Sequence, residues 1–194
     1  MSKKGNETKH FIKEQAYKLF AERGFKDVTM KDICEITGLS RGGLYRHYDS
    51  TDQIFSEIIE TFLDSQNNSF KAKMEAQTPA PQILDEILQK YKVEMIDTKS
   101  SLSMAIYEYF SNRKLEGSNN YLTKQYIASF TSWDTLIQYG ISRGEFNQVN
   151  IAGVFDLLIF AYQGVRMYSQ LMNIDDGIPE RIIEQVKILL ISKE

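Results

Sequence analysis

The chain has 194 residues, 42% of them apolar, which is enough for one or two small domains with a buried core. One cysteine excludes an intrachain disulfide, and one cysteine with two histidines leaves too few ligands for a structural zinc site. The formal net charge of −3 is unevenly distributed. Residues 1–48 carry ten Lys or Arg and six Asp or Glu (+4), whereas the remainder carries 13 Lys or Arg and 20 Asp or Glu (−7). This distribution suits a phosphate-binding part on an acidic body.

No stretch approaches the roughly 18 uninterrupted apolar residues that a membrane helix needs. The N-terminal residues MSKKGNETKH are basic, but no apolar run follows them, so they do not read as a secretory signal. Only three prolines occur, and helix-forming residues are abundant. We therefore expect an all-α cytoplasmic protein with no membrane partner.

The first predicted helix spans residues 8–23. Ile12, Ala16, Leu19 and Phe20 recur at helical spacing and form one apolar face. Gly24 then reads as the glycine that commonly ends a helix. This helix is expected to pack across the next two and complete a three-helix head.

Residues 29–48, TMKDICEITGLSRGGLYRHY, predict two short helices joined by a sharp turn. Thr29 can cap the first helix and Ser40 the second, while Gly38 permits the positive φ of the turn. We expect Ile33 and Ile36 to point inward. Such an element is a helix-turn-helix, whose second helix enters the major groove of DNA.

The outward face of the second helix carries the chemistry for reading DNA. Arg41, near its N-terminus, can pair with the guanine O6 and N7 atoms, and Arg46 can reach either base or backbone. The glycines beside Arg41 leave a bare surface for close approach, although a loosely wound helix start with no role is the alternative. The candidate DNA-binding residues are Thr29, Lys31, Ser40, Arg41, Gly42, Gly43, Tyr45, Arg46, His47 and Thr51.

Three segments, LFAERGF (19–25), the stretch 29–48 and STDQIF (50–55), resemble the DNA-binding domain of the TetR family of bacterial transcriptional regulators. The resemblance covers about the first quarter of the chain. It implies a DNA-binding domain in residues 1–50 and a ligand-binding and dimerisation domain in residues 51–194. It also implies that Tyr45 and His47 contact phosphate.

The chain departs from the family pattern at three positions. Cys34 replaces an alanine, and Tyr48 replaces a phenylalanine. Thr51 replaces a lysine that touches DNA phosphate in relatives, so this contact becomes neutral or is lost.

Beyond residue 50 the pattern predicts a helical bundle of about six helices. The fourth helix of the chain starts near Asp49–Gln53 and reaches toward residue 70, and Pro79 and Pro81 mark a break. Further helices are predicted at 81–97, 100–115, 120–142, 149–173 and 179–192, with a separator at residues 117–120.

The last two predicted helices are apolar around much of their circumference. A helix of that kind is covered on both sides, and a second copy of the chain is the simplest cover for the side away from the core. The resemblance also implies a homodimer through these helices, although 149–173 could instead be only a central core helix. The candidate interface residues are Phe155, Leu158, Tyr162, Ile182, Val186 and Leu189.

The resemblance further implies a small-molecule effector that binds among the middle helices and releases DNA. Aromatic and sulfur-containing residues are dense there, which favours an apolar or aromatic effector, although each is also a plausible core residue. The candidate pocket residues are Tyr91, Met95, Tyr107, Phe110, Tyr126, Phe130, Trp133, Tyr162 and Arg166.

The sequence leaves two other classes of protein as alternatives. No nucleophile elbow, zinc-protease, phosphate-loop or dinucleotide motif occurs, so we expect no enzyme and no cofactor. An interaction protein with a helix-turn-helix that no longer binds DNA is the second alternative, suggested by Thr51 and the acidic total. Within the family reading, repression is the expected mode and activation is the alternative.

Overall fold

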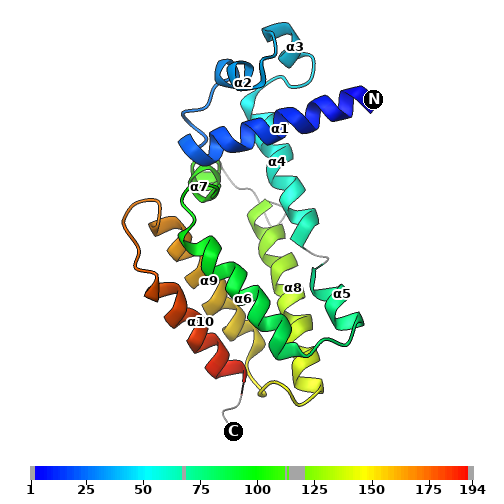
Figure 1. Ribbon diagram of the computed structural model, residues 1–194, viewed down its shortest axis with the longest axis vertical. Helices are drawn as coiled ribbons and strands as arrows, with labels where there is room; N and C mark the ends of the chain where they lie inside the picture. The colour runs from blue at the N-terminus through cyan, green and yellow to red at the C-terminus, as the bar shows by residue number, and fades with distance from the viewer. Residues whose placement is uncertain (1–2, 67–68, 112, 114–120, 192–194) are drawn as a thin grey trace. The chain divides into compact units, whose positions relative to one another are not determined.

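The computed structural model describes residues 3–66, 69–111, 113 and 121–191. Within these residues the chain forms ten α-helices and no strand, which confirms the all-α class with an N-terminal helix-turn-helix and a helical body (Figure 1). None of the described helices is both long enough and apolar enough to span a bilayer.

The chain separates into two compact units, which are described in turn. The helix-turn-helix unit comprises Met1–Asp64 and Lys99–Leu115, and the bundle unit comprises Ser65–Thr98 and Glu116–Glu194. The functional division at residue 50 stays a prediction.

The helix-turn-helix unit is built on α1, which packs against both α2 and α7, while α2 packs against α3. Its buried apolar side chains include Ile12 and Phe20 of α1, Ile33 of α2 and Leu44 of α3. The helices are α1 (Lys3–Arg23), α2 (Met30–Thr37), α3 (Arg41–Tyr45), α4 (Thr51–Gln66) as far as Asp64, and α7 (Ser103–Ser111).

Helix α7 was expected within residues 100–115 of the body, but it packs in the helix-turn-helix unit. Its Tyr109 ring lies 4.9 Å, centroid to centroid, from both Phe25 and Phe55. Phe55 lies in turn 4.9 Å from Phe20. This aromatic cluster draws α7 toward α1 and α4, because burying large aromatic rings is among the strongest packing contributions.

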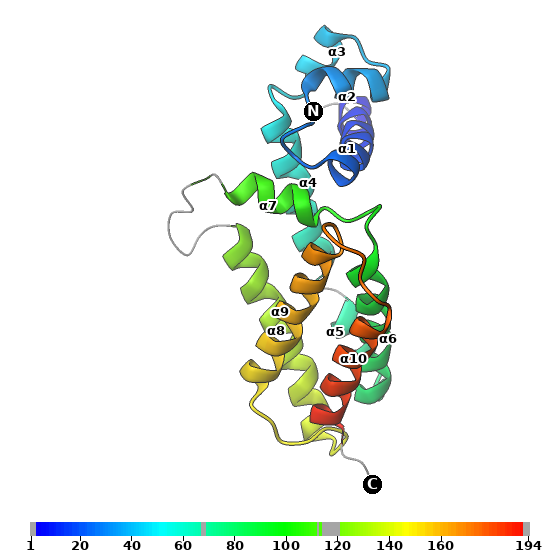
Figure 2. The same cartoon turned by 90° about the vertical axis from the view of Figure 1, so that its left-hand side faces the viewer.

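In the bundle unit, α9 packs against α6, α8 and α10, and Figures 1 and 2 show these four helices side by side. The helices are α5 (Ser69–Glu75), α6 (Ala80–Ile96), α8 (Tyr121–Ser142), α9 (Ile151–Tyr168) and α10 (Gly177–Leu190). The buried core comprises Ala80, Ile83, Leu84, Leu88, Trp133, Leu136, Ile137, Phe146, Val154, Phe155, Leu158, Ile183, Val186 and Leu190.

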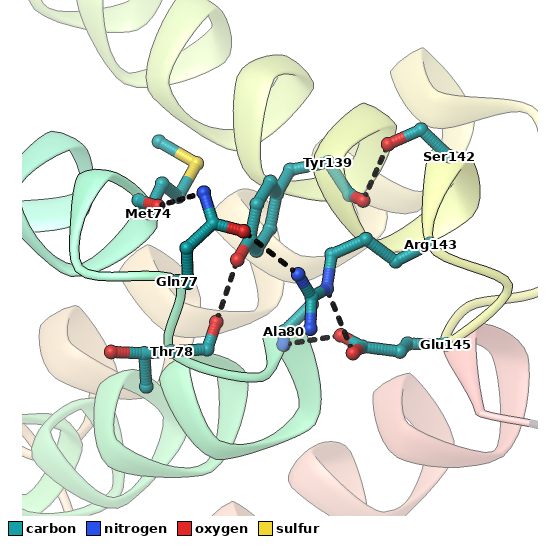
Figure 3. A network of polar contacts seen from close by, with 8 residues as sticks. All are labelled: Met74, Gln77, Thr78, Ala80, Tyr139, Ser142, Arg143 and Glu145. Atoms are coloured by element: carbon teal, nitrogen blue, oxygen red, sulfur yellow. Dashed lines mark hydrogen bonds and ion pairs between the residues drawn. The ribbon is translucent and has the colours of Figure 1, made fainter.

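Polar contacts join the α5–α6 connection to the end of α8 (Figure 3). The Tyr139 hydroxyl donates to the carbonyl of Thr78 at 2.9 Å, and Arg143 pairs with Glu145 at 2.8 Å. The other carboxylate oxygen of Glu145 accepts the backbone N–H of Ala80 at 2.6 Å, at the start of α6. These contacts satisfy two backbone groups of the α5–α6 connection and hold the start of α6 against the end of α8.

Two of the predicted boundaries were wrong. The helix predicted at 149–173 ends at Tyr168, where the backbone N–H groups of Leu171 and Met172 both turn back to the Tyr168 carbonyl at 2.9 Å. The first helix, predicted to start at residue 8, already includes Lys3. The fourth helix, predicted to reach toward residue 70, is described as far as Gln66. The separator predicted at residues 117–120 lies outside the described residues.

Candidate nucleic-acid interface

Helix α2 begins at a reciprocal capping box. The backbone N–H of Asp32 donates to the Thr29 hydroxyl at 3.3 Å, and the Asp32 carboxylate accepts the backbone N–H of Thr29 at 2.8 Å. Hydrogen bonds from Thr29 hold the pKa of Asp32 below its usual value. Arg23, the last residue of α1, pairs with the same carboxylate at 3.3 Å. The start of α2 is therefore fixed both locally and to α1.

The turn between α2 and α3 depends on Gly38. Its φ of +68° lies in the left-handed region, which residues with a Cβ rarely adopt. Ser40 then starts α3 by accepting the backbone N–H of Gly43 at 3.1 Å. The sequence predicted all of these turn and cap residues correctly.

Helix α3 has only five residues, of which Leu44 is fully buried and fixes the inner side. The side chains of Arg41 and Arg46 are exposed, and Tyr45 keeps 42% of its surface accessible. An added Cβ at Gly42 would meet no atom within 4 Å, so this part of the surface is open. The exposed face thus combines two guanidinium groups, a phenol and bare backbone.

Behind α3, Tyr48 anchors the chain to α1 and α4. Its hydroxyl donates to the Glu57 carboxylate at 2.9 Å, and Lys9 donates to the other oxygen of that carboxylate, also at 2.9 Å. Burial raises the pKa of Tyr48, and the neighbouring Glu57 raises it further. Burial alone would raise the pKa of Glu57, but the hydrogen bonds from Lys9 and Tyr48 outweigh it and lower this pKa. This half-buried ion pair helps to hold the back of the interface in place.

All ten candidate DNA-binding residues lie in the helix-turn-helix unit. Ile36, expected to point inward, is 37% exposed, because α2 turns that side outward. Lys31 is the most exposed cation at the start of α2, with 85% of its side chain accessible. The exposed candidates are Thr29, Lys31, Ser40, Arg41, Gly42, Tyr45 and Arg46, and the half-buried ones are Gly43, His47 and Thr51.

Residues 12–58 match the family profile described as bacterial regulatory proteins of the TetR family. Residues 83–177 match the profile of the tetracyclin repressor-like C-terminal domain. The two profiles together span both units and more than half of the chain. The chain belongs to the TetR family. It is accordingly a DNA-binding transcriptional regulator.

Curated relatives agree with this assignment to the TetR family. The chain is 34% identical over 142 residues to the HTH-type transcriptional regulator YfiR of Bacillus subtilis, an alignment that covers 71% of this chain and 67% of the relative. It is 28% identical over 153 residues to the HTH-type transcriptional repressor KstR2 of Rhodococcus jostii, covering 77% of this chain and 74% of the relative.

Solved structures support the TetR fold at lower sequence identity. A TetR transcriptional regulator of Chloroflexus aurantiacus superposes with a TM-score of 0.76 at 20% identity, covering 98% of this chain and all of that one. A transcriptional regulator of Saccharomonospora viridis in complex with choline superposes with a TM-score of 0.79 at 15% identity, covering 97% of this chain and all of that one.

The predicted effector-pocket residues of this TetR-family chain are divided between the two units. Tyr107 and Phe110 lie on α7, in the helix-turn-helix unit, and Tyr107 is 59% exposed. In the bundle unit, the rings of Tyr91 and Tyr162 stack at 4.3 Å, and Trp133 donates its indole N–H to the Tyr91 hydroxyl at 3.4 Å. Tyr126 and Phe130 lie instead around the ring of Phe155, and Met95 is buried.

Polar groups border the Tyr91–Tyr162 stack. The Tyr162 hydroxyl donates to the Glu94 carboxylate at 2.5 Å and accepts from the Arg166 guanidinium at 2.9 Å. Burial raises the pKa of Tyr162, which keeps the phenol protonated as a donor. A cleft of about 500 Å³ lies at the end of α9, lined by Ile96, Thr98, Ser169, Gln170, Leu171, Met172, Asn173, Ile174 and Asp176. None of the predicted pocket residues lines this cleft.

Four of the predicted dimer-interface residues, Phe155, Leu158, Tyr162 and Val186, are buried inside the protomer. These side chains keep at most 5% of their surface exposed and so have little left to offer a second copy, and their place in an interface stays a prediction. Ile182 is half-buried and Leu189 is exposed, so both remain available. The large exposed apolar side chains of these two helices and of the turn after α9 are Leu157, Phe160, Tyr168, Leu171, Met172, Ile188 and Leu189.

Proposed function

We propose that this TetR-family regulator binds a palindromic DNA operator as a homodimer and represses transcription until a small effector releases it. The observation that carries the proposal is the exposed face of α3. Arg41, Tyr45 and Arg46 project from a short helix whose start, turn and inner side are all fixed. Among the described residues no atom lies within 4 Å of a Cβ added at Gly42, which suits close approach to a groove or phosphate.

Phosphate contacts would come from the start of α2 and from around α3. The side chain of Lys31 is 85% exposed. Its ion pair with Glu35, at 3.7 Å, is exposed too and therefore contributes little to stability. Thr29, with its backbone at a helix N-terminus, can meet a phosphate oxygen, helped by the helix dipole. Thr51 is the half-buried first residue of α4, and its hydroxyl can supply only a neutral contact.

The homodimer would form on the exposed faces of α9 and α10. Leu157, Phe160 and Tyr168 are spaced i, i+3 and i+11, which places them along one side of α9. Each of the three keeps more than half of its surface accessible, and α10 adds Ile188 and Leu189. An exposed apolar surface of this extent is typical of a protein–protein interface. A two-fold symmetric pair presents two recognition helices, which is why the operator should be palindromic.

The effector site would lie by Tyr91, Trp133 and Tyr162, where aromatic faces meet the Glu94 carboxylate and the Arg166 guanidinium. Aromatic rings favour an apolar or aromatic effector. Because the similarly folded regulator of Saccharomonospora viridis holds choline, choline belongs in the first compounds screened. Repression is favoured by the repressor named among the relatives.

Selection of bound DNA from a random-sequence pool tests the proposal. The expected result is a palindrome whose half-sites are separated by one helical turn or a multiple of it, roughly 34–36 Å per turn. A selected site without two-fold symmetry would contradict the dimeric arrangement. Failure to enrich any DNA, even at low salt, would instead favour an interaction protein without DNA binding. Transcription of a template carrying the site, with and without protein, separates repression from activation.

A further inference from the structure

The carboxylate of Glu108, on α7, closes the turn between α1 and α2. One oxygen, Oε2, accepts the backbone N–H of Phe25 at 2.7 Å and that of Lys26 at 3.0 Å. Both N–H groups follow the end of α1, and a charged acceptor forms stronger hydrogen bonds with them than a neutral one. The turn is therefore held by a residue more than 80 positions away in the sequence.

Gly24 allows the carboxylate to come this close. Its φ of +78° is in the left-handed region, and a Cβ at this position would lie only 2.6 Å from Oε2 of Glu108. A larger residue would have to push the carboxylate away from the turn. The absence of a side chain at Gly24 thus leaves the space that the Glu108 carboxylate occupies beside the turn.

Neighbouring side chains fix the position of α7, so Glu108 does not reach the turn on a loose helix. The Arg113 guanidinium lies 3.4 Å from the centroid of the Tyr109 ring and also pairs with Asp52 of α4. The Tyr109 hydroxyl donates to the same Asp52 at 3.2 Å. Tyr17 of α1 donates to the carbonyl of Ser100, just before α7, at 2.6 Å.

The closed turn leads directly to the recognition element. Lys26 is followed within a few residues by the Thr29 cap of α2, and Arg23, just before the turn, pairs with the Asp32 carboxylate of that cap. A shift of the turn would thus move both Arg23 and the Thr29 cap, the two residues that orient α2. Because α2 packs against α3, the change would reach the exposed face of α3.

We propose that Glu108 is a positioning residue for DNA binding: by closing the α1–α2 turn, it sets the orientation of α2 and α3. The inference rests on the proposed DNA-binding function.

Amide hydrogen exchange and DNA affinity, both measured at a temperature where every protein is folded, test the role of Glu108. Glu108→Ala should speed exchange not only at Phe25 and Lys26 but throughout α2, and should weaken binding to the selected operator by about ten-fold. Glu108→Gln keeps an oxygen acceptor and should restore most of both properties. Glu22→Ala, which removes an exposed carboxylate from α1, should change neither.

Faster exchange confined to Phe25 and Lys26, with unchanged operator affinity, would overturn the proposal and leave Glu108 a local cap. If Glu108→Ala does not fold, Glu108→Asp replaces it, because one methylene less draws the carboxylate back while its charge is kept. It should shift α2 exchange and affinity in the same direction. If the wild type enriches no DNA, the proposed function fails, while the exchange of α2 still decides whether Glu108 orients it.

Discussion

The hydroxyl of Ser40 accepts the backbone N–H of Gly43 at 3.1 Å, and this hydrogen bond starts the recognition helix. Helix α3 is only five residues long and contains two glycines, each of which costs about 1 kcal/mol relative to alanine in a helix interior. It has little stability of its own. The cap and the buried Leu44 are therefore what keep the exposed face in place.

Ser40→Ala should lower the free energy of unfolding by about 1 kcal/mol and weaken operator binding, because the helix loses its cap. Ser40→Gly is the matched variant, since glycine at a cap costs only a few tenths of a kcal/mol. Both changes remove the hydroxyl. If Ser40 acts through the cap, the glycine variant should bind DNA better than the alanine variant. Equal losses of affinity would show a direct contact of the hydroxyl with DNA instead.

Lys31→Ala should weaken binding to all DNA sequences by a similar factor, because a phosphate contact carries no base preference. The slope of log affinity against log salt should become less steep by about one unit. Lys124→Ala removes the same charge from an exposed position on α8 and should leave affinity and slope unchanged. Titrations at several salt concentrations give both quantities. A variant whose affinity loss depends on the base sequence would contradict the phosphate role of Lys31.

Leu157→Glu should convert the dimer to monomer, because it places a charge on the exposed apolar face of α9. Val93 of α6 is equally exposed, at 66%, but lies outside that face. Val93→Glu is therefore the matched control and should remain dimeric. Sedimentation equilibrium at micromolar concentration distinguishes the two. Dimers of both variants, or a monomeric wild type, would count against the proposed interface.

Acid should loosen α1 from α4 through Glu57. The pKa of this carboxyl is lowered in the folded protein from an ordinary value of 4.5, so its stabilisation is complete above that pH. It is lost as the pH falls through the lower, folded pKa. Glu57→Gln should be less stable than the wild type at pH 7, yet its free energy of unfolding should fall less steeply below pH 4.5. Urea unfolding from pH 3 to 7 measures this, and parallel curves would contradict it.

Local features of the recognition element could be predicted from the sequence because they depend on neighbouring residues. Thr29 and Ser40 are caps at fixed spacing from the groups they bind, and the left-handed turn at Gly38 needs a glycine. The position of α7 could not be predicted in this way. Glu108 meets the backbone of Phe25 across 83 positions, and nothing in the local pattern of either segment indicates the other.

Which side of α9 is exposed could not be predicted from the sequence either. This helix is apolar around its circumference, so periodicity could indicate that both sides are covered but not which side faces the core. The structure settles the inner side at Phe155 and Leu158, and leaves Leu157 and Phe160 outside. The aromatic residues of the predicted pocket were ambiguous for the same reason, because packing and ligand binding use the same side chains.

The affinity of Arg41→Ala for the selected operator and for each of its single-base variants tests the central claim most directly, namely that the exposed face of α3 reads DNA sequence. The variant should lose discrimination at one position in each half-site, by a factor of about 5 to 150, and keep it elsewhere. Unchanged discrimination at every position would show that Arg41 does not read sequence.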